Sequence, residues 1–182
     1  AEAMAPCVLW IDEIDKGFGG DARSDGGTSQ RVLANVLTWM AEKTSAVFVV
    51  ATSNGVERLH PELLRKGRFD EIFLLDLPTI EERFKILELH ILQRRPDLII
   101  PLQTVVDRTE GFSGAEMEQT VIEGMHLAFA ERRELEESDL ILAASQLIPL
   151  SRTAREQLES LKAWAASGRA RPASLNLNKL IT

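Results

Sequence analysis

Two adjacent carboxylates follow an apolar run near the start of the chain. Asp12 and Glu13 come directly after residues 7–11, in the stretch CVLWIDEID. Burial of unpaired negative charges is costly, and a bound cation would compensate the charge of two carboxylates at the end of a buried strand. Mg²⁺ binds carboxylate oxygens, water and substrate phosphates, so Asp12 is a candidate ligand. Glu13 is a candidate acceptor of a proton from an attacking water. Taken alone, the pair slightly favours the simpler interpretation of an aspartate helix cap beside a solvated glutamate.

An amide and two arginines are the next candidates. Asn54 ends the apolar stretch VFVVATSN, where a lone asparagine before glycine usually forms an Asx turn. Arg65 and Arg68 flank Gly67, the expected end of a short helix that begins at Pro61. Cations favour a helix C-terminus, and guanidinium groups also suit bidentate phosphate binding. The spacing alone does not distinguish a role at the helix C-terminus from a role in phosphate binding.

The elements around these residues predict where they meet. Residues 7–11, 47–51 and 71–78 are continuous apolar runs, typical of parallel strands that are covered on both faces. A helix is expected over 29–42, with one apolar face formed by Val32, Leu33, Val36, Leu37 and Met40. Strand, helix and strand form a right-handed βαβ unit, so the first two strands end at the same edge of the sheet. Asp12, Glu13 and Asn54 are therefore expected to converge where α/β folds bind ligands.

Helices replace strands after Pro78. Thr79 with Glu82, and Ser113 with Glu116, have the spacing of capping boxes. The second helix carries an apolar stripe, and further helices are expected near residues 102–109, 136–147 and 152–166. The stripe consists of Met117, Val121, Ile122, Met125 and Phe129. The expected division is an α/β part over 1–77, a helical domain over 78–150, and a C-terminal helix and tail over 151–182.

Composition excludes few classes of function. Hydrophobic residues make up 45% of the 182 and charged residues 27%, as in soluble globular proteins. The net charge of −7 gives no general attraction to nucleic acid or to an anionic membrane. The single cysteine, Cys7, cannot form an internal disulfide and suits a reducing compartment. No apolar run reaches the length of a membrane span.

Taken together, the motifs resemble the AAA family within the AAA+ ATPases. VLWIDEID resembles its Walker B strand, VVATSN its sensor-1 strand and PELLRKGRFDE its arginine-finger segment, while ILELHI and GFSGAE resemble the lid helices. The motifs follow the family order over roughly residues 4–132, closest to the cyanobacterial and chloroplast-reading-frame AAA ATPases. The resemblance implies part of the P-loop NTPase α/β sheet, followed by a small helical lid. GVERLH, after Asn54, departs from the usual Arg-Pro pattern.

The resemblance also implies a role for each candidate. Asp12 would coordinate Mg²⁺, Glu13 would activate the hydrolytic water and Asn54 would be sensor 1. Arg65 and Arg68 would reach the nucleotide of a neighbouring subunit in a ring, which is a hexamer in the family expectation. His90, Gly114 and Ala115 would border the base and ribose of ATP; without the resemblance, they are a half-buried histidine and small residues at a capped helix start. Residues 17–29, GFGGDARSDGGTS, occupy the position of the second pore loop.

One family motif does not occur in the sequence. The phosphate-binding GxxxxGK[ST] loop would precede residue 1, and its strand would lie between the strands at 47–51 and 71–76. We therefore expect a fragment of a longer ATPase that remodels a macromolecular partner in the cytoplasm or, if plastid-encoded, in the chloroplast stroma; by itself the fragment should be inactive. The alternative is a non-catalytic interaction module with a degenerate nucleotide site. A membrane-bound AAA protease is disfavoured, because the sequence has no HExxH motif.

Overall fold

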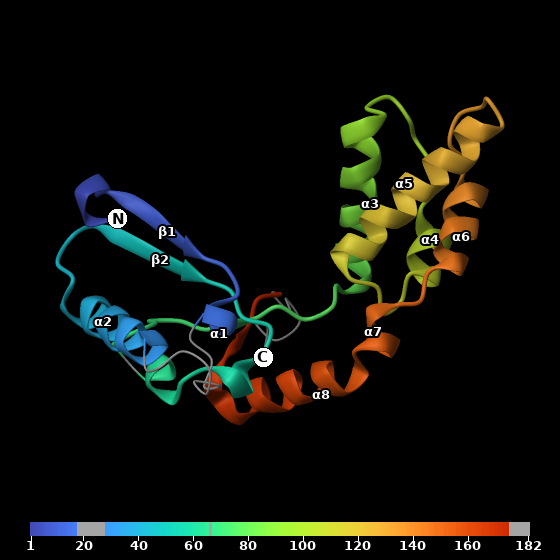
Figure 1. Ribbon diagram of the computed structural model, residues 1–182. Coiled ribbons are helices and arrows are strands. Elements are labelled where there is room, and N and C mark those ends of the chain that lie inside the picture. The colour runs from blue at the N-terminus through green and yellow to red at the C-terminus, as the bar shows by residue number, and fades with distance from the viewer. Residues whose placement is uncertain (18–27, 66, 175–182) are drawn as a thin grey trace, which may run out of the picture. The chain divides into compact units, whose positions relative to one another are not determined.

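Two parallel strands form the small sheet in the N-terminal part of the chain. A computed structural model describes residues 1–17, 28–65 and 67–174 (Figure 1). Strand β1 (Cys7–Ile11) pairs in parallel with β2 (Val47–Ala51), from Cys7 opposite Val47 to Ile11 opposite Ala51. Helix α2 (Thr28–Glu42) lies between them in the sequence. The predicted βαβ order and parallel pairing are confirmed.

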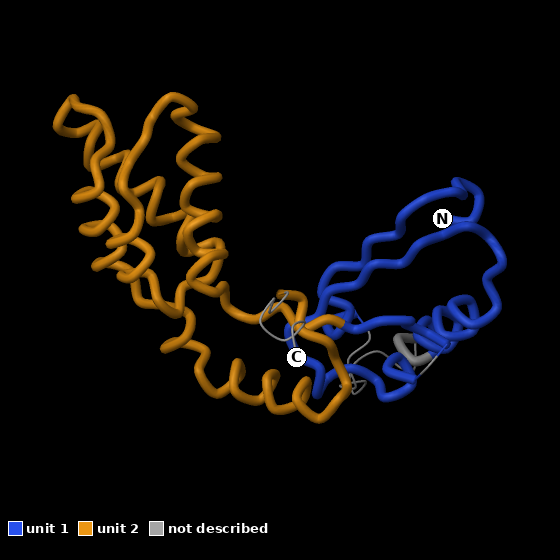
Figure 2. Tube along the Cα trace, turned by 180° about the vertical axis from the view of Figure 1, so that it is seen from behind, with its two compact units in different colours: residues 1–72 blue, residues 73–182 orange. Residues whose placement is uncertain are grey.

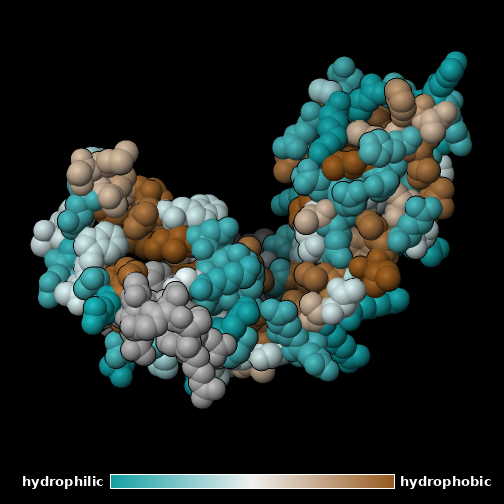
Figure 3. Space-filling model, in the orientation of Figure 1, coloured by the Kyte–Doolittle hydropathy of each residue, from teal (hydrophilic) through white to brown (hydrophobic). Residues whose placement is uncertain are grey.

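Helix α2 covers one face of this strand pair. The core beneath it contains Leu33, Leu37 and Met40, with Ile11 and Ala51 packed against it. The other face is open among the described residues: Val8 and Trp10 are each 66% exposed and Phe48 is 69% exposed, and Figure 3 shows hydrophobic surface over β1 and β2. The prediction of cover on both faces was wrong, because no described element packs on the face that carries Val8, Trp10 and Phe48. Val32, expected on the buried face of α2, is also exposed.

Short helical turns complete the first of two compact units, Ala1–Ile72 and Phe73–Thr182, which Figure 2 distinguishes by colour. The first unit also contains η1 (Glu2–Met4), α1 (Ile14–Gly17), η2 (Val56–Arg58) and η3 (Pro61–Leu64). Leu63 of η3 and Ile14 of α1 are buried in the same core as α2. The loops that carry the candidate residues are thus anchored by apolar side chains of their own.

Four helices form the core of the second unit. They are α3 (Ile80–Arg94), α4 (Gln103–Arg108), α5 (Gly114–Ala130) and α6 (Glu137–Gln146), and they bury Leu87, Val105, Met117, Val121 and Leu140. Both predicted capping boxes are present, with the hydroxyls of Thr79 and Ser113 accepting from the backbone N–H groups of Glu82 and Glu116. Phe129 is 82% exposed, so the apolar stripe of α5 ends before this residue.

Two predicted elements of the second unit differ from the structure. Residues 71–78 form only a two-residue strand, β3 (Phe73–Leu74), which pairs with β4 (Arg171–Pro172) and not with β2. A strand is extended and buried by the strands that pair with it, and among the described residues β3 has only the two-residue strand β4 as a partner. The helix expected over 152–166 is interrupted at Ala154, giving α7 (Leu150–Thr153), α8 (Arg155–Trp164) and a short π-helix, η4 (Ala165–Arg169).

Candidate nucleotide-hydrolysis site

The carboxyl ends of β1 and β2 lie side by side. The strand pairing continues beyond the last ladder residues, since the Thr52 N–H donates to the Ile11 carbonyl at 3.0 Å and the Ile14 N–H donates to the Thr52 carbonyl at 2.8 Å. These bonds hold the turn after β1 against the segment after β2. We call the group formed by Asp12, Glu13, Thr52 and Asn54 the strand-end site.

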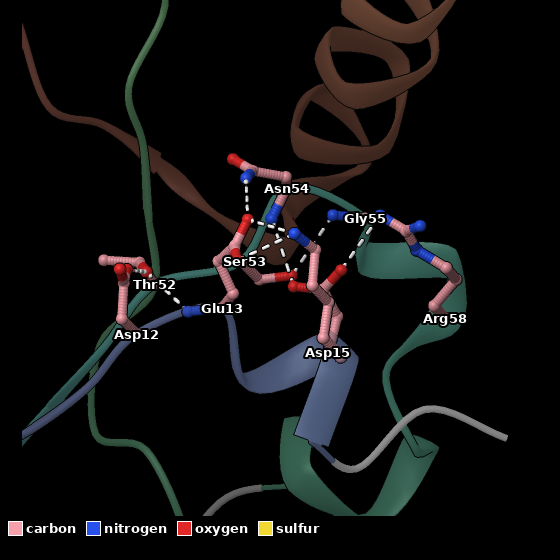
Figure 4. Close-up of polar contacts among 9 residues, drawn as sticks. Asp12, Glu13, Asp15, Thr52, Ser53, Asn54, Gly55 and Arg58 are labelled. Atoms are coloured by element: carbon pink, nitrogen blue, oxygen red, sulfur yellow. Dashed lines mark hydrogen bonds and ion pairs between the residues drawn. The ribbon is translucent and has the colours of Figure 1, made fainter.

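Thr52 joins the two halves of the strand-end site. Its hydroxyl accepts a hydrogen bond from the Glu13 N–H at 3.0 Å and donates one to Asp12 Oδ1 (Figure 4). The hydroxyl therefore fixes both the backbone of one acid and the carboxylate of the other. Sequence reasoning missed Thr52, because no periodicity distinguishes it from an ordinary residue at the end of a strand.

Glu13 contacts Asn54 as the sequence predicted. The Asn54 Nδ2 donates to Glu13 Oε1 at 3.2 Å, and the Lys16 ammonium lies 2.7 Å from the same oxygen. Glu13 has a φ of 48°, in the left-handed region that residues other than glycine seldom adopt. Such a conformation costs about 1–3 kcal/mol and tends to occur at functional sites. The convergence of the acid pair and the amide is confirmed.

A buried carboxylate lies next to the strand-end site. Asp15 of α1 has no exposed side-chain surface, and its Oδ1 accepts from the Asn54 N–H at 3.3 Å. Its Oδ2 lies 2.9 Å from Nη2 of Arg58, in η2. Sequence reasoning missed both residues. The available signals were the third acid of DEID and the arginine within the unusual GVERLH segment.

The two candidate arginines lie outside the strand-end site. Arg68 donates from Nη1 to the Leu37 carbonyl of α2. Arg65 follows η3, is exposed and forms no ion pair within the described part of the chain. Gly67, between them, has a φ of +89°, a left-handed value that glycine adopts readily. The prediction that Gly67 ends the helix was wrong, because η3 ends at Leu64 and Arg65 is its C-cap. The structure thus leaves Arg65 accessible and directs Arg68 toward α2.

The remaining candidates belong to the helical unit. His90, on α3, lies with its Nδ1 3.6 Å from Oε1 of Glu118 on α5. Arg94 donates to the same oxygen at 2.7 Å, and this hydrogen bond holds the pKa of the Glu118 carboxyl below its usual value. Gly114 and Ala115 open α5, and a Cβ atom added at Gly114 would meet no other atom within 4 Å. Their expected contacts with a nucleotide stay predictions.

The donor set of the strand-end site suits one kind of metal. No group of three or more His, Cys, Asp or Glu side chains that could hold an ion occurs among the described residues. Mg²⁺ in nucleotide sites takes only one or two carboxylates, with water and phosphates as its other ligands. The exposed Asp12 carboxylate, steadied by Thr52 at one oxygen, fits that requirement. The suggested second pore loop cannot be compared, because residues 18–27 lie outside those described.

Comparison with known proteins identifies the class. Residues 1–77 match the family model described as "ATPase family associated with various cellular activities (AAA)". A solved structure of the FIGL-1 AAA domain in complex with ADP superposes with a TM-score of 0.74, at 22% identity, over 92% of this chain and 59% of that one. This structural likeness confirms the fold: a partial AAA α/β unit followed by helices. The chain belongs to the AAA family of ATPases.

Within this family, the chain is similar to proteins that are themselves named as uncharacterized. It is 50% identical over 177 residues to the AAA domain-containing protein ycf46 of Trieres chinensis, and 50% identical over 181 residues to that of Pyropia yezoensis. Each match covers 96% of this chain and 36% of the relative, so the chain spans about a third of their length. It is also 37% identical to the ATP-dependent zinc metalloprotease FtsH of Mesoplasma florum, over 74% of this chain and 21% of that protein.

No described helix has the length and apolar character needed to span a bilayer.

Proposed function

We propose that the polypeptide containing this chain is a Mg²⁺-dependent AAA+ ATPase, and that the strand-end site is its hydrolytic centre. The observation that carries the proposal is the contact of Asn54 Nδ2 with Glu13 Oε1, 3.2 Å, beside Asp12 at the ends of two parallel strands. Membership of the AAA family supports the same chemistry. The 182 residues do not contain a GxxxxGK[ST] motif, so the proposal concerns the longer polypeptide.

Each residue of the strand-end site has a distinct part in the proposed reaction. Asp12 would hold Mg²⁺, which neutralises charge on the phosphates when it is bound. Glu13 accepts the proton of the attacking water, and the Asn54 amide keeps that carboxylate oriented. Thr52 holds both acids in place, since it binds the backbone of Glu13 and the side chain of Asp12. Lys16 also binds Glu13, so the carboxylate has to release or share this exposed contact when it binds water.

The other candidates act elsewhere in the proposed assembly. We propose that Arg65 and Arg68 serve the nucleotide of an adjacent subunit, which requires a closed head-to-tail ring, in this case a hexamer. The exposure of Arg65 supports this role more strongly than the position of Arg68, which already binds the Leu37 carbonyl. His90, Gly114 and Ala115 are the proposed contacts with the base and ribose of ATP.

The proposed outcome of hydrolysis is the remodelling of a protein partner. Neither nucleic acid nor a membrane is part of the proposal. The proposed compartment is the cytoplasm, or the chloroplast stroma for a plastid-encoded protein.

The test is ATP hydrolysis by the full-length protein with and without Mg²⁺. We expect phosphate release that stops when the metal is chelated and returns when Mg²⁺ is added back. An intact GxxxxGK[ST] about fifty to sixty residues before Asp12 should accompany this activity. A degenerate loop together with no hydrolysis would favour the non-catalytic interaction module instead.

A further inference from the structure

Asp15 is a buried charge that the proposed mechanism does not use. Its carboxylate has no exposed surface, although the acid pair before it in the sequence reaches the surface. Oδ1 accepts from the Asn54 N–H at 3.3 Å. Oδ2 has no hydrogen bond of good geometry among the described residues and lies 2.9 Å from Arg58 Nη2, so this contact is an ion pair. A buried carboxylate needs such a partner, because an uncompensated charge in the interior is strongly unfavourable.

The absence of a side chain at Gly55 provides the space that the Arg58 guanidinium occupies in this ion pair. A Cβ atom added to Gly55 would lie 2.4 Å from Arg58 Nε and 2.5 Å from Arg58 Nη2. Both distances are far below van der Waals contact, so the guanidinium occupies the place that a side chain at position 55 would fill. A larger residue at position 55 therefore requires the Arg58 guanidinium to shift from the place where it contacts Asp15. Figure 4 shows the three residues together, beside Asn54.

Asn54 connects this ion pair to the strand-end site. Its backbone N–H binds Asp15, while its side-chain amide binds Glu13. The backbone bond helps to hold the Asn54 main chain in place, so a shift of the Asp15 carboxylate would disturb the residue whose amide binds Glu13. The segment that follows Asn54 is also the one that departs from the usual family pattern, and it supplies both Gly55 and Arg58.

We propose that Arg58 is a positioning residue for ATP hydrolysis. It neutralises Asp15 and thereby holds the Asn54 amide on Glu13, with Gly55 providing the space. This inference rests on the proposed ATPase function. It concerns the rate of the chemical step and predicts little effect on ATP binding, because Arg58 has no assigned contact with the nucleotide.

The experiment compares variants of the full-length protein by kcat and KM for ATP, and by hydrogen exchange of peptides covering residues 52–60. Arg58→Met and Gly55→Ala should each lower kcat about 10- to 100-fold, the cost of a small misplacement of a catalytic group, with KM changed less than about twofold. Both should raise exchange at Asn54, whose N–H loses a fixed acceptor. Arg58→Lys should recover part of kcat, and Arg31→Met, on the exposed side of α2, is the matched control.

The outcomes separate this proposal from the function on which it rests. An inactive wild-type protein would overturn the ATPase function and this role together. An active wild type whose kcat and exchange are unchanged in both Arg58→Met and Gly55→Ala would overturn the positioning role alone. If Arg58→Met does not fold, Gly55→Ala and Arg58→Lys decide: a lowered kcat in the first and partial activity in the second support the role, and wild-type kcat in Gly55→Ala contradicts it.

Discussion

At the scale of single residues, the strand-end site depends on hydrogen bonds between two loops. Glu13 is held through its carboxylate by Asn54 and Lys16, and through its backbone by Thr52. Its φ of 48° is a strained value that these contacts maintain. Two of these three partners, Thr52 and Asn54, lie 39 and 41 residues away from Glu13 in the sequence.

Replacement of Thr52 tests this placement. Thr52→Val keeps the β-branched shape and removes the hydroxyl, leaving the Glu13 N–H without its acceptor and Asp12 without its donor. We expect about 2 kcal/mol less stability, since each of the two lost hydrogen bonds has a net value of about 1 kcal/mol. The kcat should be at least about tenfold lower in the full-length protein. Urea unfolding of this chain and steady-state ATP hydrolysis by the full-length protein are the measurements.

Thr52→Ser is the matched control, because it retains the hydroxyl. Its kcat should stay close to that of the wild type. Equal losses in the serine and valine variants would show that the methyl group of Thr52 matters, and would contradict the role assigned to its hydroxyl.

The sequence predicted which acids and which amide form the strand-end site, but not the residues that hold them in place. The meeting of Asp12, Glu13 and Asn54 follows from one fact of topology, since parallel neighbouring strands end at one edge. Thr52, Asp15 and Arg58 could not be predicted in the same way. Their roles depend on how two irregular loops face each other, and neither hydrophobic periodicity nor turn chemistry encodes that arrangement.

At the scale of elements, an ion pair in the helical unit joins the loop after α5 to the start of α6. Asp139 is buried and receives two hydrogen bonds of 2.6 Å from the guanidinium of Arg133, and one of 2.9 Å from the Glu136 N–H. The hydrogen bonds from Arg133 hold the pKa of the Asp139 carboxyl below its ordinary value of 3.8. The charge thus ties the loop after α5 to the first turn of α6.

The lowered pKa of Asp139 has a consequence for stability. A carboxyl whose pKa is lower in the folded state stabilises the fold above its unfolded pKa, and this contribution is lost as the pH falls through the folded pKa. Asp139→Asn should therefore reduce the free energy of unfolding at neutral pH by about 2 kcal/mol, the range for a hydrogen bond to a charged group. The difference from wild type should shrink as the pH falls below 3.8.

Urea unfolding of this chain at neutral and acid pH measures the effect. Asp97→Asn, which changes an exposed aspartate in the same unit, is the control and should behave as wild type. A difference between Asp139→Asn and wild type that stays constant with pH would contradict the ion-pair explanation.

Elements were predicted well where local signals define them. The capping boxes at Thr79 and Ser113 begin α3 and α5 as expected. The run over 71–78 failed as a long strand because strand formation depends on partners, and local composition says nothing of these. Leu75, 83% exposed, shows how little the apolar character of this run determines burial.

At the scale of the whole molecule, the proposed ring makes each hydrolytic centre a joint product of two subunits. Glu13 and Arg65 then belong to different subunits at any one centre. Arg65→Ala should lower hydrolysis strongly, on the order of 10³-fold if it acts as arginine fingers do elsewhere. Mixing Arg65→Ala with Glu13→Gln should restore part of the activity, because about a quarter of the interfaces in an equal, random mixture would have both groups.

Phosphate release by the mixture, compared with each variant alone, is the measurement. Arg68→Ala should behave similarly when mixed, although loss of its bond to Leu37 adds a local effect on α2. A mixture no more active than the average of its components would contradict action between subunits.

The most direct test of the central claim is made on Glu13→Gln in the full-length protein. The substitution keeps the size and shape of the side chain and removes its ability to accept a proton. ATP binding and single-turnover hydrolysis should be measured on the same preparation. We predict unchanged binding with hydrolysis reduced at least about 100-fold, the usual loss when a general base is removed. Hydrolysis at the wild-type rate would contradict the assignment of the strand-end site as the hydrolytic centre.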